Sequence, residues 1–226
     1  MKDLITIGLP SKGRLKDKAI SFFNDRGLKI LQSEKERNYF GTIENKNNIK
    51  IIFLHAKEII QRLGDGTLDI GVSGLDLLKE SEKNLQVKIN VQRKLNFGNA
   101  NLVIAVPDDW IDVQTIADIE EVSFDIRSKR NTRLRVATKY PNLTNDFLIS
   151  KGVTQYKLIP SLGATETYPF IGSSEIITDI TSTGKTLVDN NLRILKDGLI
   201  LSSNACLFIA KKKAAKLQPF LKSLGR

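Results

Sequence analysis

Short apolar segments alternate with segments of helical periodicity along this chain, and the alternation limits the possible folds more than any other feature. A short apolar run bounded by glycine or proline predicts a buried strand, whereas apolar residues recurring every three or four positions predict a helix. The alternation pauses near residue 100 and then begins again. Repeated strand–helix units are typical of α/β folds with a largely parallel sheet, so the two runs predict two α/β lobes.

The order of the segments gives an outline of the fold. We expect strands at residues 4–9, 50–54, 68–72, 102–106, 134–138, 156–159, 176–180, 199–201 and 205–210. We expect helices at residues 15–25, 56–63, 75–80, 143–151, 165–170, 186–192 and 214–224. No polar linker separates the runs, and we place lobe I at residues 1–98 plus 204–226 and lobe II at residues 99–203. A cleft between two such lobes is a common ligand site.

The formal net charge of +10 is concentrated in two segments. Each holds six cations with no acidic residue between them: Arg127, Lys129, Arg130, Arg133, Arg135 and Lys139 in the first, and Lys211, Lys212, Lys213, Lys216, Lys222 and Arg226 in the second. Removing these twelve charges from +10 leaves −2 for the rest of the chain. Solvated surfaces, a polyanionic small ligand and an acidic partner all explain such segments. Aromatic residues do not alternate with the cations, which argues against a nucleic-acid-binding module.

The chain has one cysteine and one histidine, which excludes several kinds of metal-binding and catalytic site. Cys206 is the only cysteine, which excludes a disulfide framework and a cysteine-based zinc centre and indicates a reducing compartment. His55 is the only histidine, so a site with two imidazoles is excluded, and we expect no metal site built by the protein alone. No segment approaches the roughly 20 apolar residues that span a bilayer, and the first residues are too short for a signal peptide. We therefore expect a cytoplasmic protein that binds neither membrane nor nucleic acid.

The strongest chemical pattern follows the strand expected at 176–180. A hydroxyl-rich turn there leads into a helix, and its candidate binding residues are Asp179, Thr181, Ser182, Thr183, Gly184, Lys185 and Thr186. Free backbone N–H groups at a helix start favour a phosphate, and Asp179 is able to accept from sugar hydroxyls or hold Mg²⁺ through water. A capped helix after a buried strand explains the same pattern. A Walker A motif is excluded, because it requires a glycine where Asp179 stands.

Two further segments place glycine at expected strand ends. Lys12, Gly13 and Arg14 open the first helix, where Gly13 allows the backbone to approach a ligand and the cations suit a diphosphate or triphosphate. Ligands also gather at the carboxyl ends of parallel strands, and the candidates on the strand near residue 70 are Asp69, Gly71, Ser73 and Gly74. An exposed helix start and a tight turn are the alternative explanations.

Taken together, these segments resemble the ATP phosphoribosyltransferase family, which begins histidine biosynthesis. The resemblance follows most of the chain in order, at residues 9–15 (LPSKGRL), 66–74 (GTLDIGVSG), 97–98 (FG), 136–141 (VATKYP), 162–166 (LGATE) and 179–187 (DITSTGKTL). The last segment is the strongest match. Two positions depart from the family pattern: many members have Arg where His55 stands, and Asp or Gly where Asn96 stands.

The resemblance implies a two-lobe fold like that of type II periplasmic binding proteins, with a cleft between the lobes. It implies transfer of the phosphoribosyl group of phosphoribosyl pyrophosphate to N1 of ATP, with Mg²⁺ carried by the substrates. The chain looks like the short form of the family, which works with a regulatory subunit similar to a histidyl-tRNA synthetase catalytic domain, and a homodimer is expected for the chain on its own. The main alternative is a small-anion solute-binding protein of the same fold.

The resemblance also implies roles for the candidate residues. Arg14 and Arg37 are expected to be catalytic and to meet the departing pyrophosphate, with Lys12 beside them. The turn 181–186 is expected to hold the ribose 5-phosphate, while Asp179 and Glu166 hold the ribose hydroxyls. Residues 69–74 are expected to line the cleft from the other lobe.

Overall fold

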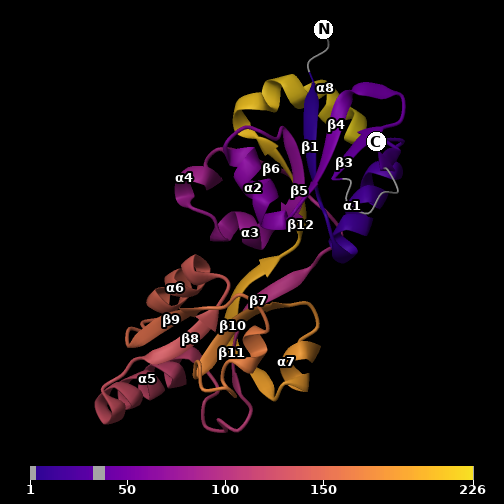
Figure 1. Ribbon diagram of the computed structural model, residues 1–226. Coiled ribbons are helices and arrows are strands. Elements are labelled where there is room, and N and C mark those ends of the chain that lie inside the picture. Colours follow the sequence, from indigo (N-terminus) through magenta and orange to yellow (C-terminus); the bar gives the residue numbers. More distant parts are fainter. Residues whose placement is uncertain (1–3, 33–38, 226) are drawn as a thin grey trace. The chain divides into compact units, whose positions relative to one another are not determined.

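The chain folds into two compact units, each with its own β-sheet. A computed structural model describes residues 4–32 and 39–225. Unit 1 contains residues 1–98 and 204–226, and unit 2 contains residues 99–203. Helices pack against the sheet of each unit (Figure 1), so the predicted two-lobe α/β fold is confirmed. Within the part of the chain that is described, no helix has the length and apolar character needed to cross a membrane.

Unit 1 is built on a mixed sheet with the strand order β2-β3-β4-β1-β5-β12-β6. Its strands are β1 (Ile5–Pro10), β2 (Ile30–Gln32), β3 (Phe40–Ile43), β4 (Lys46–Leu54), β5 (Ile70–Gly74), β6 (Ile89–Lys94) and β12 (Ala205–Ala210). Only β4, β1 and β5 pair in parallel, and the other described pairings are antiparallel. The expectation of a largely parallel sheet is therefore correct only for the centre of this sheet.

Helices cover both faces of the unit 1 sheet. They are α1 (Gly13–Asn24), α2 (Ala56–Gly64), α3 (Leu75–Glu80), α4 (Lys83–Gln86) and α8 (Ala214–Leu224), the last preceded by the 3₁₀ turn η2 (Lys211–Lys213). Strand β12 is buried on both faces: Leu207 packs in the cluster with α1 and α8, whereas Phe208 packs in the cluster with α2 and α3. Burial on both sides explains why this strand is a continuous apolar run.

Unit 2 is built on a second mixed sheet with the order β11-β7-β10-β8-β9. Its strands are β7 (Ala100–Pro107), β8 (Leu134–Thr138), β9 (Tyr156–Pro160), β10 (Ile176–Thr181) and β11 (Leu192–Ser203). Its helices are α5 (Ile116–Arg130), α6 (Pro141–Ser150), α7 (Lys185–Asp189) and the 3₁₀ turn η1 (Thr165–Thr167). Strands β10, β8 and β9 are parallel neighbours, so their carboxyl ends lie at one edge of the sheet.

The structure corrects the expected outline at several places in unit 2. The strand expected at 199–201 is part of the longer β11, and the helix expected at 165–170 is only the 3₁₀ turn η1. The helix expected at 186–192 ends at Asp189, because Asn191 takes a left-handed conformation and Leu192 is buried as the first residue of β11. Helix α5 was not expected, since its buried residues include Ser123 between apolar positions and the apolar spacing is broken. Strands β2, β3 and β6 and helix α4 of unit 1 were not predicted either. Most residues of β2 and β6 are exposed, β3 alternates exposed and buried residues, and α4 has no buried residue.

A buried ion pair fastens the returning segment of the chain to unit 1. Lys213 Nζ lies 2.7 Å from Asp69 Oδ1, and the Asp69 side chain is only 2% exposed. Thr6 donates to Asp69 Oδ2 through its backbone N–H at 2.6 Å and its hydroxyl at 2.8 Å. Burial by itself would raise the pKa of Asp69, but the hydrogen bonds from Lys213 and Thr6 together lower that pKa below its ordinary value. We call this arrangement the Asp69–Lys213 clamp.

Lys213→Met should lower the free energy of unfolding at neutral pH by about 2–3 kcal/mol, because it leaves a buried carboxylate without its cation. The matched control is Lys212→Met, which removes a neighbouring exposed lysine and should change stability by less than about 0.5 kcal/mol. Denaturant unfolding of both variants measures the difference. Because folding lowers the Asp69 pKa, its stabilisation is present above about pH 4 and is lost as pH falls through the folded-state pKa. Equal losses in both variants would contradict the clamp.

Candidate active site

Three loops of unit 2 meet at the carboxyl edge of its parallel strands. Thr138 of β8 pairs with Thr178 of β10 on one side and with Pro160 of β9 on the other. Lys139 follows β8, Glu166 lies in the 3₁₀ turn η1 after β9, and Asp179 lies near the end of β10. Open α/β sheets bind ligands at such edges. We call this region the carboxyl edge of unit 2.

The turn after β10 presents backbone donors and hydroxyls together. Thr181 Oγ1 accepts from the Gly184 N–H at 2.9 Å, and Thr183 Oγ1 accepts from the Lys185 N–H at 3.3 Å. Gly184 has φ +75°, a left-handed conformation that glycine adopts without strain. Within the described chain, the N–H groups of Ser182, Thr183 and Thr186 carry no hydrogen bond, and all three residues are exposed. The turn therefore offers free donors to an anion.

The helix that follows this turn contributes little through its dipole. Helix α7 spans only five residues, Lys185–Asp189, and too few peptide dipoles are aligned for a strong field. The Lys185 ammonium is exposed and forms an ion pair with Asp189 at 3.1 Å. Exposed pairs of this kind are weak, so the ammonium can exchange that partner for a ligand. Anion binding here depends on the local N–H groups and hydroxyls.

Asp179 is the carboxylate most strongly affected by this environment. Burial raises its pKa and the Glu166 carboxylate raises it further, while the backbone N–H of Ile180 and the Lys139 ammonium act in the opposite direction. The net result is a raised pKa. The fold thus brings together Asp179 and Glu166, both of which the sequence singled out, and adds Lys139. The sequence places Lys139 in a basic segment and in the resembling segment 136–141, but does not single it out as a site residue, although it directly follows an expected strand.

The turn that carries Glu166 is held by buried hydroxyl groups. Ser161 Oγ lies 2.8 Å from Thr165 Oγ1, and both side chains are buried. Ala164 between them has φ +45°, a left-handed conformation that is unusual for a residue with a Cβ. The Thr167 hydroxyl donates to the Ala164 carbonyl at 2.8 Å. These contacts fix the backbone on both sides of Glu166.

In unit 1 the predicted cations lie at the carboxyl edge of its parallel strands. Lys12, Gly13 and Arg14 directly follow β1, and the side chains of Lys12 and Arg14 are exposed. Neither cation forms an ion pair with any residue in the described ranges. Gly13 has φ +68° with open space where a Cβ would stand. Two cations are therefore available to an anionic ligand.

The segment 69–74 makes structural contacts in unit 1, and its predicted role in binding substrate stays an expectation. Asp69 precedes β5 at the amino end of the parallel strands and is held in the clamp. A Cβ on Gly71 would lie 2.5 Å from Ile59 Cγ2, so this glycine allows α2 to pack on the sheet. Ser73 is buried and donates to the Ala56 carbonyl at 2.8 Å. Ser73 and Gly74 are the last two residues of β5 and lie at its carboxyl end.

Two other positions complete the comparison with the sequence. Arg37, predicted to be catalytic, lies outside the described residues. His55 begins α2, where its side chain accepts from the Lys57 N–H at 3.3 Å. This hydrogen bond caps the amino end of α2. In the described ranges, no three His, Cys, Asp or Glu side chains gather into a group that could hold a metal ion.

Comparisons with known proteins agree on one family. The HisG model of ATP phosphoribosyltransferases matches residues 55–225. An ATP phosphoribosyltransferase of Chelativorans sp. (strain BNC1) is 45% identical, and the alignment covers 92% of this chain and 91% of the relative. The ATP phosphoribosyl transferase (HisG:HisZ) complex from Thermotoga maritima contains a chain of similar structure, with a TM-score of 0.75 and 25% identity over 98% of this chain and 97% of that one.

More distant structures share only the fold. The substrate binding protein of an amino acid ABC transporter has a TM-score of 0.56 and 13% identity, with coverage of 98% of this chain and 92% of that one. This likeness agrees with the predicted type II periplasmic-binding-protein-like architecture.

Two substitutions should move the Asp179 pKa in opposite directions. Lys139→Met removes an attractive charge and should raise that pKa further, whereas Glu166→Gln removes a repulsive charge and should lower it. Carbon-13 NMR titration of the Asp179 carboxyl group measures both shifts. Lys157→Met removes an exposed lysine of β9 and should leave the titration unchanged. Shifts of the same sign in the first two variants would show that these charges do not face Asp179.

Proposed function

The chain belongs to the ATP phosphoribosyltransferase family, and from this premise we propose how its residues perform the family's reaction. The enzyme transfers the phosphoribosyl group of phosphoribosyl pyrophosphate to ATP, the first step of histidine biosynthesis. N1 of the adenine ring forms a bond to the anomeric carbon, and the bond from that carbon to pyrophosphate breaks. The products are phosphoribosyl-ATP and pyrophosphate.

The main physical difficulty of this reaction is charge. Two polyanionic substrates must lie side by side while a third polyanion leaves. A strong nucleophile from the protein is not required, because the adenine nitrogen attacks directly. The protein must orient the reactants and supply donors and cations where negative charge collects.

We assign the ribose 5-phosphate to the turn 181–186. The observation that carries this assignment is the set of free backbone N–H groups at Ser182, Thr183 and Thr186, which lie beside their own hydroxyls. Convergent backbone N–H groups bind phosphate oxygens without needing a formal positive charge. The Lys185 ammonium, exposed nearby, adds a cation.

Asp179 and Glu166 are assigned to the ribose. Their carboxylates sit together at the carboxyl edge of unit 2 and can accept hydrogen bonds from two hydroxyls of a pentose. Developing positive charge on the sugar ring would be stabilised by the same carboxylates. Magnesium, when bound with the substrate phosphates, neutralises part of their charge. A pair of carboxylates suits Mg²⁺ that keeps most of its other oxygen ligands from phosphate and water.

The pyrophosphate is assigned to Arg14 and Lys12 of unit 1. Both are exposed at the carboxyl edge of the parallel strands, and Gly13 between them leaves the backbone open to a ligand. An arginine fork binds phosphate oxygens in pairs, which suits a leaving pyrophosphate. Arg37 keeps its predicted catalytic role as an expectation.

We also propose that the chain assembles with a regulatory subunit of the HisZ type. The support is the likeness to a chain of the HisG:HisZ complex from Thermotoga maritima, which extends over 98% of this chain. A homodimer of this chain is the expected state without that subunit.

A solute-binding function is less well supported. The transporter-related structures are only 13% identical and share the fold alone. The relatives that match at 44–45% identity are phosphoribosyltransferases. The direct test mixes the purified chain with ATP, phosphoribosyl pyrophosphate and Mg²⁺ and follows product by ultraviolet absorbance, with and without a HisZ-type subunit. Tight binding of a small anion with no product under either condition would favour the solute-binding alternative.

Arg14→Ala should lower kcat by about 10²-fold, because one oriented charge-assisted contact contributes about 2–4 kcal/mol in such a site. Arg130→Ala is the control, since Arg130 is an exposed arginine at the end of α5, and it should change kcat less than about twofold. Steady-state rates of both variants at saturating substrate concentrations measure the difference in kcat. Full activity of Arg14→Ala would remove Arg14 from the scheme.

Thr183→Val should raise the KM for phosphoribosyl pyrophosphate about tenfold and leave the KM for ATP nearly unchanged, because one hydrogen bond to a charged group is lost. Thr183→Ser keeps the hydroxyl and should restore the KM. Initial-rate kinetics with each substrate varied in turn separates the two constants. If the KM for ATP rises instead, the turn holds the other substrate.

A further inference from the structure

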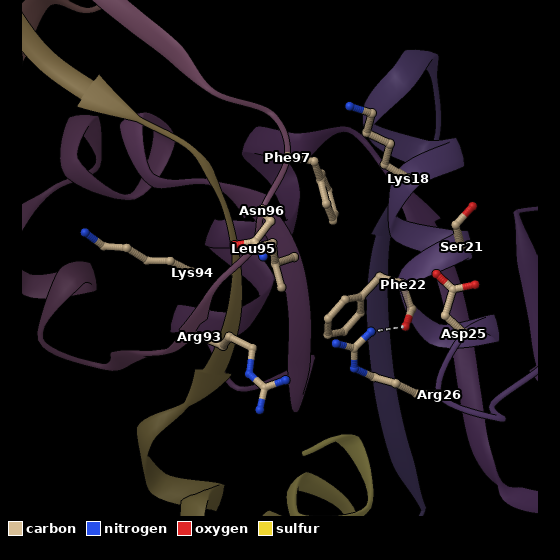
Figure 2. A pocket seen from close by; sticks show the side chains of 10 residues that line it. All are labelled: Lys18, Ser21, Phe22, Asp25, Arg26, Arg93, Lys94, Leu95, Asn96 and Phe97. Atoms are coloured by element: carbon tan, nitrogen blue, oxygen red, sulfur yellow. Dashed lines mark hydrogen bonds between the residues drawn. The ribbon is translucent and has the colours of Figure 1, made fainter. Parts of the chain in front are cut away.

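Unit 1 contains a cavity that none of the residues assigned to the reaction lines. Its volume is ≈ 510 Å³, and its walls come from α1, from β6 and from the segment that follows β6 (Figure 2). This volume lies within the range of small-molecule sites in proteins. The cavity is therefore large enough for an organic molecule and not only for a single inorganic ion.

Two arginines at one end of the cavity are held by the same oxygen atom. Arg26 Nε donates to the Leu224 carbonyl at 3.0 Å, and Arg93 NH1 donates to that carbonyl at 3.3 Å. Arg26 NH1 also donates to the Phe22 carbonyl at 3.0 Å, and its guanidinium lies 3.9 Å from the centre of the Phe22 ring. These contacts hold the Arg26 guanidinium at Nε and NH1 before a ligand arrives, which lowers the entropy lost on binding, whereas the exposed Arg93 is held by the contact with Leu224.

The charge around this cavity is not balanced by the surrounding residues. Four of its lining residues are cationic, and only Asp25 is acidic. Figure 2 shows the Lys94 side chain directed away from the arginines, whereas Arg26 and Arg93 face the same space. Among the residues described, no carboxylate forms an ion pair with either arginine. Both guanidinium groups donate to backbone carbonyls at the end of α8 or in α1, but neither has a carboxylate partner, so their remaining N–H groups can bind an oxyanion.

The rest of the cavity offers an apolar surface. Phe22 and Leu95 are part of the unit 1 core, at 8% and 3% exposure, and the Arg26 guanidinium lies over the Phe22 ring. They contribute little accessible surface, and the half-buried Phe97 contributes more. Phe97 packs partly against the same core. A planar or aliphatic group placed there would cover apolar surface beside the arginines. Ligand pockets usually combine an apolar lining with a few polar groups that orient the ligand.

We propose that this cavity binds a small organic anion, with a phosphate or carboxylate group on Arg26 and Arg93 and an apolar body over Phe22, Leu95 and Phe97. The site lies in unit 1 alone. None of its lining residues belongs to the turn 181–186, which is part of unit 2.

The test uses three probes on the full-length chain: phenyl phosphate, benzoate and inorganic phosphate. Two-dimensional NMR follows the backbone amides of residues 21–26 and 93–97 during each titration. Phenyl phosphate or benzoate should shift these amides, and inorganic phosphate, which lacks the apolar body, should bind at least tenfold more weakly. Equal affinity for inorganic phosphate and for both organic probes would overturn the assignment of the apolar surface.

Ser21→Glu tests the site without removing the arginine contacts. Ser21 is an exposed residue of α1 that lines the cavity, and a carboxylate there should compete with the probe and weaken binding at least tenfold. Gln61→Glu adds the same charge on an exposed position of α2 and should leave binding unchanged, as should Thr183→Val. Arg93→Met removes one guanidinium group of the site and should abolish binding. A thermal melt shows whether this variant is folded. Unshifted amides in the wild-type chain, or equal binding to wild type and Ser21→Glu, would overturn the proposal.

Discussion

The parallel pairing of β8, β9 and β10 is the constraint on which the unit 2 site depends. Because the three strands run in the same direction, the loops that follow them emerge at one edge. Residues far apart in sequence, such as Lys139 and Asp179, become electrostatic neighbours for this reason. The turn 181–186 follows β10 at this edge, in the same region as the carboxylates of Asp179 and Glu166 and the Lys139 ammonium.

Unit 1 depends on a contact between segments that are distant in the chain. Residues 204–226 return after unit 2 and supply both β12 and α8. The Asp69–Lys213 clamp and the burial of β12 on both faces hold this segment in place. Two residues of the basic segments are therefore structural: Lys213 belongs to the clamp, and Arg135 forms an ion pair with Glu175 at 2.6 Å. The positive charge that remains exposed is smaller than the sequence alone indicates.

Much of the fold could be predicted from the sequence, because buried strands such as β7 and β12 contain continuous apolar runs. The α/β class and the family resemblance are confirmed. Edge strands and α5 were missed where exposure or Ser123 breaks the pattern. The structural role of Asp69 could not be predicted, because the sequence shows that Asp69 is near a strand but not that Lys213 and Thr6 lie beside it. Lys139 was overlooked for the same reason, since only the strand order places it beside Asp179.

The central claim is that the turn 181–186 holds the phosphate of the pentose donor. A crystal structure of the full-length chain with bound phosphoribosyl pyrophosphate tests this most directly. The account predicts the 5-phosphate oxygens within hydrogen-bond distance of the N–H groups of Ser182, Thr183 and Thr186. A donor molecule bound elsewhere, with this turn free of phosphate, would contradict it.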